Sequence, residues 1–119
     1  MRNFRELHVW EKAMDVSIKT YSLTGGFPAE EKFGLVSQLN RAAVSISSNI
    51  AEGASRSTNK DFRRFLEIAI GSAFEVESQL LLATKLNIVS ETSVAETLKE
   101  LNELQRMLSV FIKKLNSST

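Results

Sequence analysis

The chain has 119 residues, of which 43% are apolar and 24% are charged, and its formal net charge is +1. This length and composition predict a single globular domain over residues 1–119 and argue against disorder. Because the chain has no cysteine and one histidine, thiolate metal sites, cysteine nucleophiles and multi-histidine sites are excluded.

The first predicted helix spans about residues 5–24. Asn3 and Glu6 form a capping box that is expected to start it, and Gly25 and Gly26 are expected to end it. Its predicted apolar face comprises Leu7, Trp10, Met14, Ile18 and Tyr21.

The second predicted helix starts just after Pro28, a residue type that is common in the first turn of a helix. It is expected to end at Gly53 with a left-handed cap. Its predicted apolar face comprises Leu35, Leu39, Ala42, Ile46 and Ile50.

The third predicted helix starts near Ser57 or Thr58 and ends near Asn87, and the fourth starts at about Ser90 or Thr92. Both follow the alternating spacing of three and four residues that is typical of a left-handed bundle. The third helix has this spacing at Phe62, Leu66, Ala69, Ala73, Val76, Leu80 and Ala83. The fourth has it at Val94, Leu98, Leu101, Leu108, Ile112 and Leu115, with Gln105 as the one polar member.

Short connections require consecutive helices to run antiparallel. The predicted fold is therefore an all-α, up-down-up-down four-helix bundle. Several helices carry apolar residues beyond the face that a monomeric bundle buries, which predicts a wider core or contact with another subunit. These surplus residues are Val9, Ala13, Val16, Val36, Ala43, Val44, Phe65, Ile68, Leu82, Leu104 and Phe111.

No pattern in the chain indicates catalysis or a cofactor. The motifs of phosphate loops, dinucleotide sites and nucleophile elbows are missing, and His8 is expected to lie at the surface. We therefore expect a protein that is not an enzyme and holds no metal or cofactor. No uncharged stretch is longer than ten residues, the length of residues 42–51, which is too short to span a bilayer, so we expect a cytoplasmic protein without a membrane partner.

A line of polar residues follows one side of the second helix: Gln38, Arg41, Ser45, Asn49 and Glu52. Small residues lie beside it and on the third helix, so the two backbones are expected to approach closely and polar groups between them to satisfy one another. One hypothesis is a structural network in which Arg41 pairs with Glu75 or Glu52. The alternative is a solvated face.

In an up-down-up-down bundle, the chain start, the connection between the second and third helices, and the chain end share one end. Residues 1–6, 52–64 and 113–119 hold eight cations against three acids, a net charge of +5, whereas residues 19–32 and 85–96 at the opposite end carry −1. Such a basic end attracts polyanions. The candidate nucleic-acid-binding residues are Arg56, Lys60, Arg63, Arg64, Lys113 and Lys114.

Three stretches of the sequence carry a family resemblance. They read FRELHVWEKA (4–13), GLVSQLNRAAVSISSNIAEG (34–53) and FLEIAIGSAFE (65–75), with further matches at Tyr21 to Glu30 and at Arg56. On these motifs, the chain resembles the four-helix-bundle family of 23S rRNA-intervening-sequence proteins, which includes the accessory protein of diversity-generating retroelements.

The resemblance implies a bundle without enzymatic activity that assembles into a homopentamer. It also implies binding to RNA or DNA and, in the retroelement branch, to a reverse transcriptase. The leading hypothesis is thus an oligomeric accessory protein that binds nucleic acid through its basic end, and the alternative is a protein-interaction scaffold without direct nucleic-acid binding.

Overall fold

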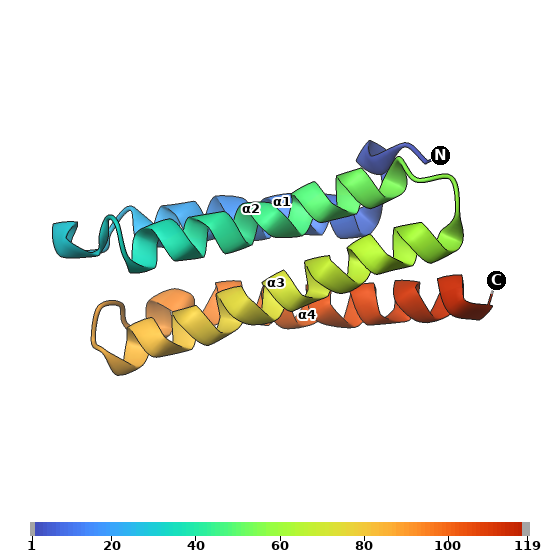
Figure 1. Ribbon diagram of the computed structural model, residues 1–119. Coiled ribbons are helices and arrows are strands. Elements are labelled where there is room, and N and C mark those ends of the chain that lie inside the picture. The colour runs from blue at the N-terminus through green and yellow to red at the C-terminus, as the bar shows by residue number, and fades with distance from the viewer. Residues whose placement is uncertain (1, 118–119) are drawn as a thin grey trace.

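The computed structural model describes residues 2–117, in which four long helices run antiparallel to their neighbours (Figure 1). The helices are α1 (His8–Thr24), α2 (Leu35–Ala54), α3 (Asn59–Lys85) and α4 (Glu91–Ser117). Two short 3-10 turns, η1 (Phe4–Glu6) and η2 (Ala29–Glu31), precede α1 and α2. The described residues contain no strand, and the predicted four-helix, all-α fold is confirmed.

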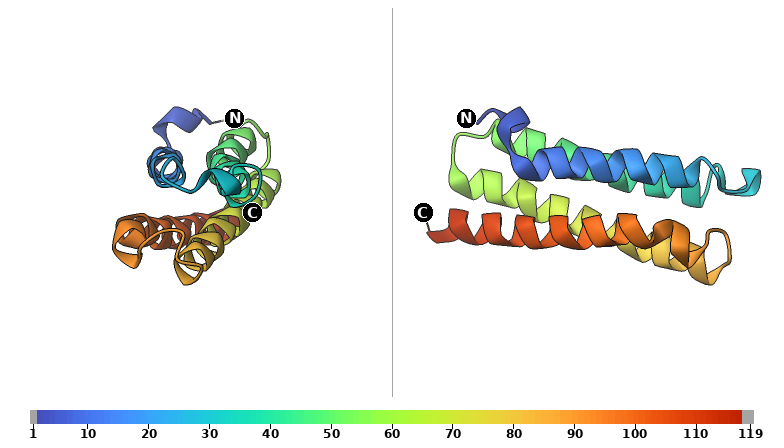
Figure 2. Two further views of the ribbon diagram at one scale, coloured as in Figure 1. Left: turned by 90° about the vertical axis from the view of Figure 1, so that its left-hand side faces the viewer. Right: turned by 180° about the vertical axis from the view of Figure 1, so that it is seen from behind.

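Each helix packs against two others, so that the four surround one common core. Helices α1 and α3 both contact α2 and α4, and the α2–α3 contact is the most extensive. The bundle measures 46 × 22 × 19 Å. The two views in Figure 2 show that the turns between helices lie at its two ends.

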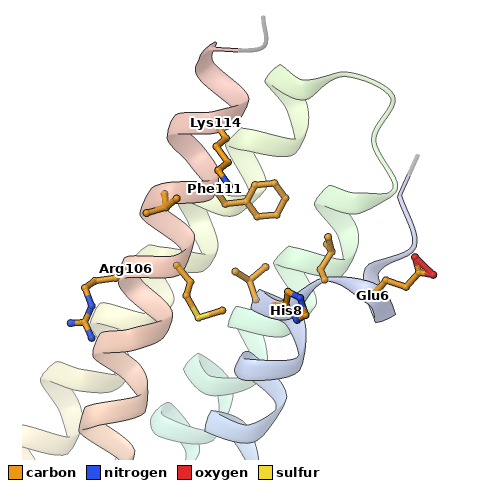
Figure 3. A pocket seen from close by; sticks show the side chains of 9 residues that line it. Glu6, His8, Arg106, Phe111 and Lys114 are labelled. Carbon is orange, nitrogen blue, oxygen red and sulfur yellow. The ribbon is translucent and has the colours of Figure 1, made fainter.

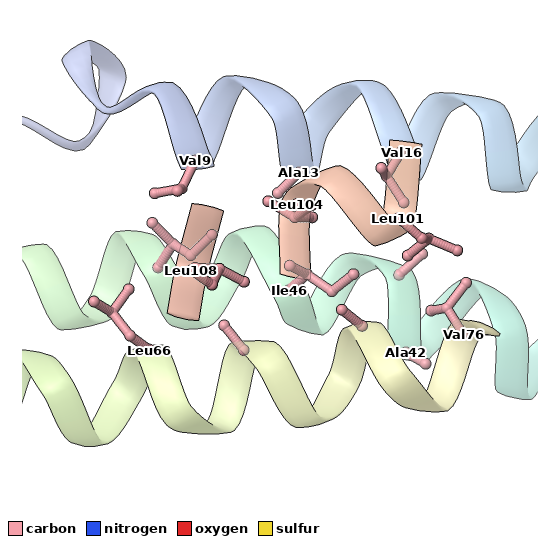
Figure 4. Packing of buried hydrophobic residues seen from close by; sticks show 14 of the residues in the cluster. Val9, Ala13, Val16, Ala42, Ile46, Leu66, Val76, Leu101, Leu104 and Leu108 are labelled. Carbon is pink, nitrogen blue, oxygen red and sulfur yellow. The ribbon is translucent and has the colours of Figure 1, made fainter. Parts of the chain in front are cut away.

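The predicted seam of α3 forms the centre of the core. All seven of its apolar members, from Phe62 to Ala83, are fully buried. They face Leu39, Ile46 and Ile50 of α2 and the buried leucines of α4, as the close-up in Figure 4 shows for part of the cluster. The heptad spacing therefore identified the interior of α3 correctly, and the apolar face predicted for α2 is buried as well. In α4, Leu98 and Ile112 of the predicted seam are only partly buried.

Helix α1 buries a different face from the predicted one, although Leu7 and Trp10 of the predicted face are partly buried against the core. Its buried side chains are small (Val9, Ala13, Val16, Thr20 and Thr24). The larger Met14, Ile18 and Tyr21, which we expected in the core, are 38%, 65% and 51% exposed. The helix carries two apolar faces, and in the single chain the smaller side chains are the ones that fill the narrow space between α2 and α4.

The first turns of two helices differ from the prediction. Asn3 does cap a turn, since its side chain accepts a hydrogen bond from the Arg5 amide at 3.1 Å, but that turn is η1, and α1 begins only at His8. Likewise, Pro28 precedes η2, and α2 begins at Leu35 after an irregular Gly34 (φ −108°, ψ −106°). The start of α3 is as predicted, with Thr58 accepting a hydrogen bond from the Asp61 amide.

Candidate nucleic-acid interface

The antiparallel arrangement brings three distant segments together at one end of the bundle. Figure 1 shows the chain start, the connection between α2 and α3, and the chain end side by side. The described part of these segments contains eight cationic and three acidic residues, so this end carries a net charge of +5. We call residues 2–6, 52–64 and 113–117 the basic end. The single histidine, His8, lies next to it and is exposed, as expected.

Most of the candidate binding residues at the basic end are accessible. Lys60, Arg64, Lys113 and Lys114 are exposed, and Arg63 and Arg56 are half-buried. The side chains of Lys60, Arg64 and Lys113 form no ion pair or hydrogen bond with another residue between 2 and 117. Their charges are therefore available to an external anion without breaking a contact.

Two arginines at the basic end instead hold the corner between α2 and α3. The Arg2 guanidinium lies 4.5 Å from the centroid of the Phe62 ring and donates a hydrogen bond to the Asn59 side chain. The Arg56 guanidinium lies 4.7 Å from the Phe65 ring and pairs with Glu52 at 3.0 Å. These contacts order the backbone from which the exposed cations project.

Gly53 allows α2 and α3 to approach closely at this corner. A Cβ atom there would lie 2.7 Å from Phe65 Cβ and 2.9 Å from Phe62 Cδ1. The expectation of a left-handed cap is wrong, because no described glycine has positive φ and α2 continues through Ala54. The glycine is required for interhelical space rather than for an unusual backbone conformation.

The polar line on α2 does meet α3, but Arg41 takes no part in these contacts. The hydroxyls of Ser45 and Ser72 are 2.9 Å apart, and Asn49 donates to the Ser45 carbonyl at 2.8 Å. The Gln79 amide bridges α2 and α3, with oxygen atoms of Gln38 and Glu75 at 3.4 and 3.3 Å.

Arg41 is exposed and forms no ion pair within residues 2–117. The predicted pairing of Arg41 with Glu75 or Glu52 is therefore absent from the single chain. Glu52 pairs with Arg56 on the next turn instead, and the Glu75 carboxylate accepts from Gln79. Arg41 lies on the outer side of α2, where it lines a shallow depression together with Tyr21 and Val44.

Two polar clusters that sequence reasoning missed connect α4 to its neighbours. The Glu77 carboxylate of α3 accepts hydrogen bonds from Gln105 at 2.8 Å and from Asn102 at 3.2 Å. This contact satisfies Gln105, the one polar member of the α4 seam, which is buried.

The second cluster joins α1 to α4. Lys12 lies 2.8 Å from Glu103 and 3.4 Å from Glu100, and Lys19 lies 2.8 Å from Glu100. The hydrogen bond that Lys19 donates lowers the pKa of Glu100, and the hydrogen bond that Lys12 donates to Glu103 raises the pKa of Lys12. Acidic groups in the middle of the bundle are thus neutralised by lysines of the middle and the opposite end, and the cations of the basic end are not drawn into these pairs.

A groove opens beside the basic end between the start of α1 and the last turns of α4. It has a volume of about 520 Å³, and its walls are formed mainly by apolar side chains. In Figure 3, Phe111 and Lys114 of α4 lie across from His8 of α1, while Arg106 lies farther along α4. The sequence could not reveal this groove, because it depends on α1 beginning at His8 rather than near Arg5.

The described residues offer no site for a metal ion. Between residues 2 and 117, no three histidine or acidic side chains come together in a way that could hold one. None of the helices in this range combines the length and the apolar run that a membrane span requires.

Comparison with protein families gives a match over most of the chain. The model of the family described as 23S rRNA-intervening sequence protein matches residues 5–110. The chain belongs to this family. Its match includes all of the helices α1, α2 and α3 and most of α4, so the family assignment applies to the whole bundle.

A solved structure agrees with the assignment of the chain to the 23S rRNA-intervening sequence protein family. The chain is similar to a protein with unknown function from the S23 ribosomal protein family of Bacteroides thetaiotaomicron, at 25% identity and a TM-score of 0.82. The similarity covers 88% of this chain and 98% of that one. A search of curated proteins finds no match.

Proposed function

We propose that this protein is a non-catalytic, oligomeric accessory protein that binds nucleic acid through its basic end. The observation that carries the proposal is the segregation of charge. A chain with a net charge of +1 places +5 on one end, whereas residues 19–32 and 85–96 at the other end carry −1. A phosphate backbone is the polyanion that such a field attracts without regard to base sequence.

The strength of binding is expected to depend steeply on salt. Each phosphate contact releases condensed counterions, and the logarithm of affinity falls with the logarithm of salt by about 0.9 per contact on duplex DNA. If the four exposed cations Lys60, Arg64, Lys113 and Lys114 each contact one phosphate, affinity falls roughly 100-fold between 50 and 200 mM salt.

The test is fluorescence anisotropy with labelled RNA and DNA over a salt series. The double variant Lys60→Glu/Arg64→Glu is expected to abolish binding at about 50 mM salt. The matched control is Lys32→Glu/Lys85→Glu, which makes the same charge change at the opposite end and is expected to retain most of the affinity. Equal losses in the two variants, or no binding by the unaltered protein at low salt, would contradict the proposal.

The oligomeric part of the proposal rests on apolar side chains that the single chain leaves exposed. Met14, Ile18 and Tyr21 are exposed on one side of α1, and Tyr21 lines a shallow depression together with Val44 of α2 and with Phe33, which is 90% exposed. A second copy covering this outer face would bury a stripe of large side chains. The family resemblance implies five copies, and a ring of aligned subunits would unite five basic ends in one surface.

The same apolar face supports a second candidate function, a protein-interaction scaffold. In the retroelement branch of the family, the resemblance implies a reverse transcriptase as partner. Co-purification of a candidate partner with the Lys60→Glu/Arg64→Glu variant distinguishes the two functions. A scaffold retains its partner when the basic end is reversed, whereas an adaptor that acts through nucleic acid loses it.

A further inference from the structure

The groove beside the basic end exists because α1 is shorter than the helices around it. Before His8, the chain turns away from α4 through η1 and runs toward α2, where the Arg2 amide donates to the Ala54 carbonyl at 2.9 Å. The right-hand view of Figure 2 shows this turn leaving the last part of α4 uncovered. The end of α4 therefore presents core-type side chains without a helix across from them.

The groove has apolar walls and positively charged residues at its margins. Leu7 and Val9 form one wall, and Met107, Val110 and Phe111 form the other. Phe111 is held in place by an edge-to-face contact with the buried Phe62 ring, whose centroid is 5.3 Å away.

Arg106 and Lys114 supply the positive charge at the margins, where the His8 side chain also lies, and Glu6 is the only acid in the lining. In Figure 3, the Glu6 side chain points away from Phe111. The lining is thus suited to a group that is flat and apolar in its middle and anionic at its edge.

We propose that this groove accepts an unstacked base of a single-stranded nucleic acid whose phosphates lie against the basic end. This inference rests on the proposed function and adds a preference for single strands. The volume of about 520 Å³ lies within the roughly 300–1,000 Å³ of small-molecule sites. Stacking on an aromatic ring tolerates any base sequence, in keeping with a site that reads no sequence. In a duplex the bases are buried in the helical stack, so only a single strand can place one in the groove.

Three labelled probes of equal length separate the contribution of the base from that of the phosphates. They are an oligothymidylate of about 12 nucleotides, an abasic strand of the same length, and a duplex of about 12 base pairs, all measured by anisotropy at about 50 mM salt. The oligothymidylate is expected to bind roughly 5- to 100-fold more tightly than the abasic strand, which is the range that stacking of one base supplies.

Two matched substitutions locate the effect in the groove. Phe111→Leu is expected to remove most of the difference between the oligothymidylate and the abasic strand while leaving the affinity for the abasic strand unchanged. Phe74→Leu makes the same change at an exposed α3 position outside the groove and is expected to alter neither affinity.

The outcomes separate the groove from the basic end. Equal affinity of the unaltered protein for the base-bearing and abasic strands overturns the groove inference and leaves the proposed function standing. Equal effects of Phe111→Leu and Phe74→Leu overturn the groove inference as well. Absence of binding to all three probes overturns both the inference and the proposed function.

Discussion

Replacing Gly53 by alanine tests the close approach of α2 and α3 at the corner that carries the basic end. The added Cβ would lie 2.7 Å from Phe65 Cβ and 2.9 Å from Phe62 Cδ1, compared with the roughly 3.5–4.0 Å at which carbon atoms pack. The nearest atom is a Cβ, which moves only with its helix. Overpacking of this kind costs about 1–3 kcal/mol, and the better helix propensity of alanine returns at most about 1 kcal/mol. We expect Gly53→Ala to lower the free energy of unfolding by about 1–2 kcal/mol.

Gly71→Ala is the matched control, because a Cβ at that exposed position in the middle of α3 meets no atom within 4 Å. It is expected to raise the free energy of unfolding by roughly 0.5–1 kcal/mol. Urea unfolding followed by circular dichroism, at one protein concentration, should separate the two midpoints by about 1 M. The reasoning is refuted if both variants shift the midpoint upward by the same amount.

Three further predictions concern other parts of the bundle. Because Lys19 and Lys12 lower the pKa of Glu100, its carboxylate binds a proton less readily in the folded state than in the unfolded state, and the free energy of unfolding falls as the pH drops through the acid range. Glu100→Gln should therefore reduce the change of the urea midpoint with pH in that range. A variant whose midpoint changes with pH as much as that of the unaltered protein would contradict this prediction. Asn87 closes α3 with φ 59°, so Asn87→Val should cost about 1–2 kcal/mol in urea unfolding, whereas Asn87→Gly should cost nothing. Ile18→Glu places a charge in the exposed stripe of α1 and should reduce the mass measured by light scattering, while an unaltered mass would exclude that stripe from subunit contacts.

Much of the fold could be predicted from spacing alone. The uninterrupted repeat from Phe62 to Ala83 fixes both the length of α3 and its buried face, and the structure buries every one of these positions. Helix α1 could not be oriented in the same way, because it has two apolar faces and periodicity does not say which one a neighbour covers. The choice depends on the space between α2 and α4, which admits Ala13 and Val16 rather than Met14 and Ile18.

The position of the candidate residues in the fold could be predicted where topology decides, but not where side-chain geometry decides. Antiparallel order is sufficient to bring Arg56, Lys60 and Lys113 to one end. Whether Arg41 meets a carboxylate, and which side chains Glu77 contacts, depends on the rotation of each helix about its axis, because a rotation of part of a turn exchanges one set of neighbours for another. A long arginine side chain beside a helix face of small residues can extend either into solvent or onto the adjacent helix, and the sequence does not indicate which of the two positions it takes.

The placement of both described chain ends at the basic end has a practical consequence for handling the protein. An affinity tag or a fluorophore fused to either end would lie close to the surface that we propose to contact phosphates. A polyhistidine or polyanionic tail there would alter the affinity for nucleic acid. The turns at the opposite end, around Gly26 and Ser90, lie at the other extreme of a 46 Å rod. Labels attached by a cysteine introduced at one of those turns would report on binding without competing for it.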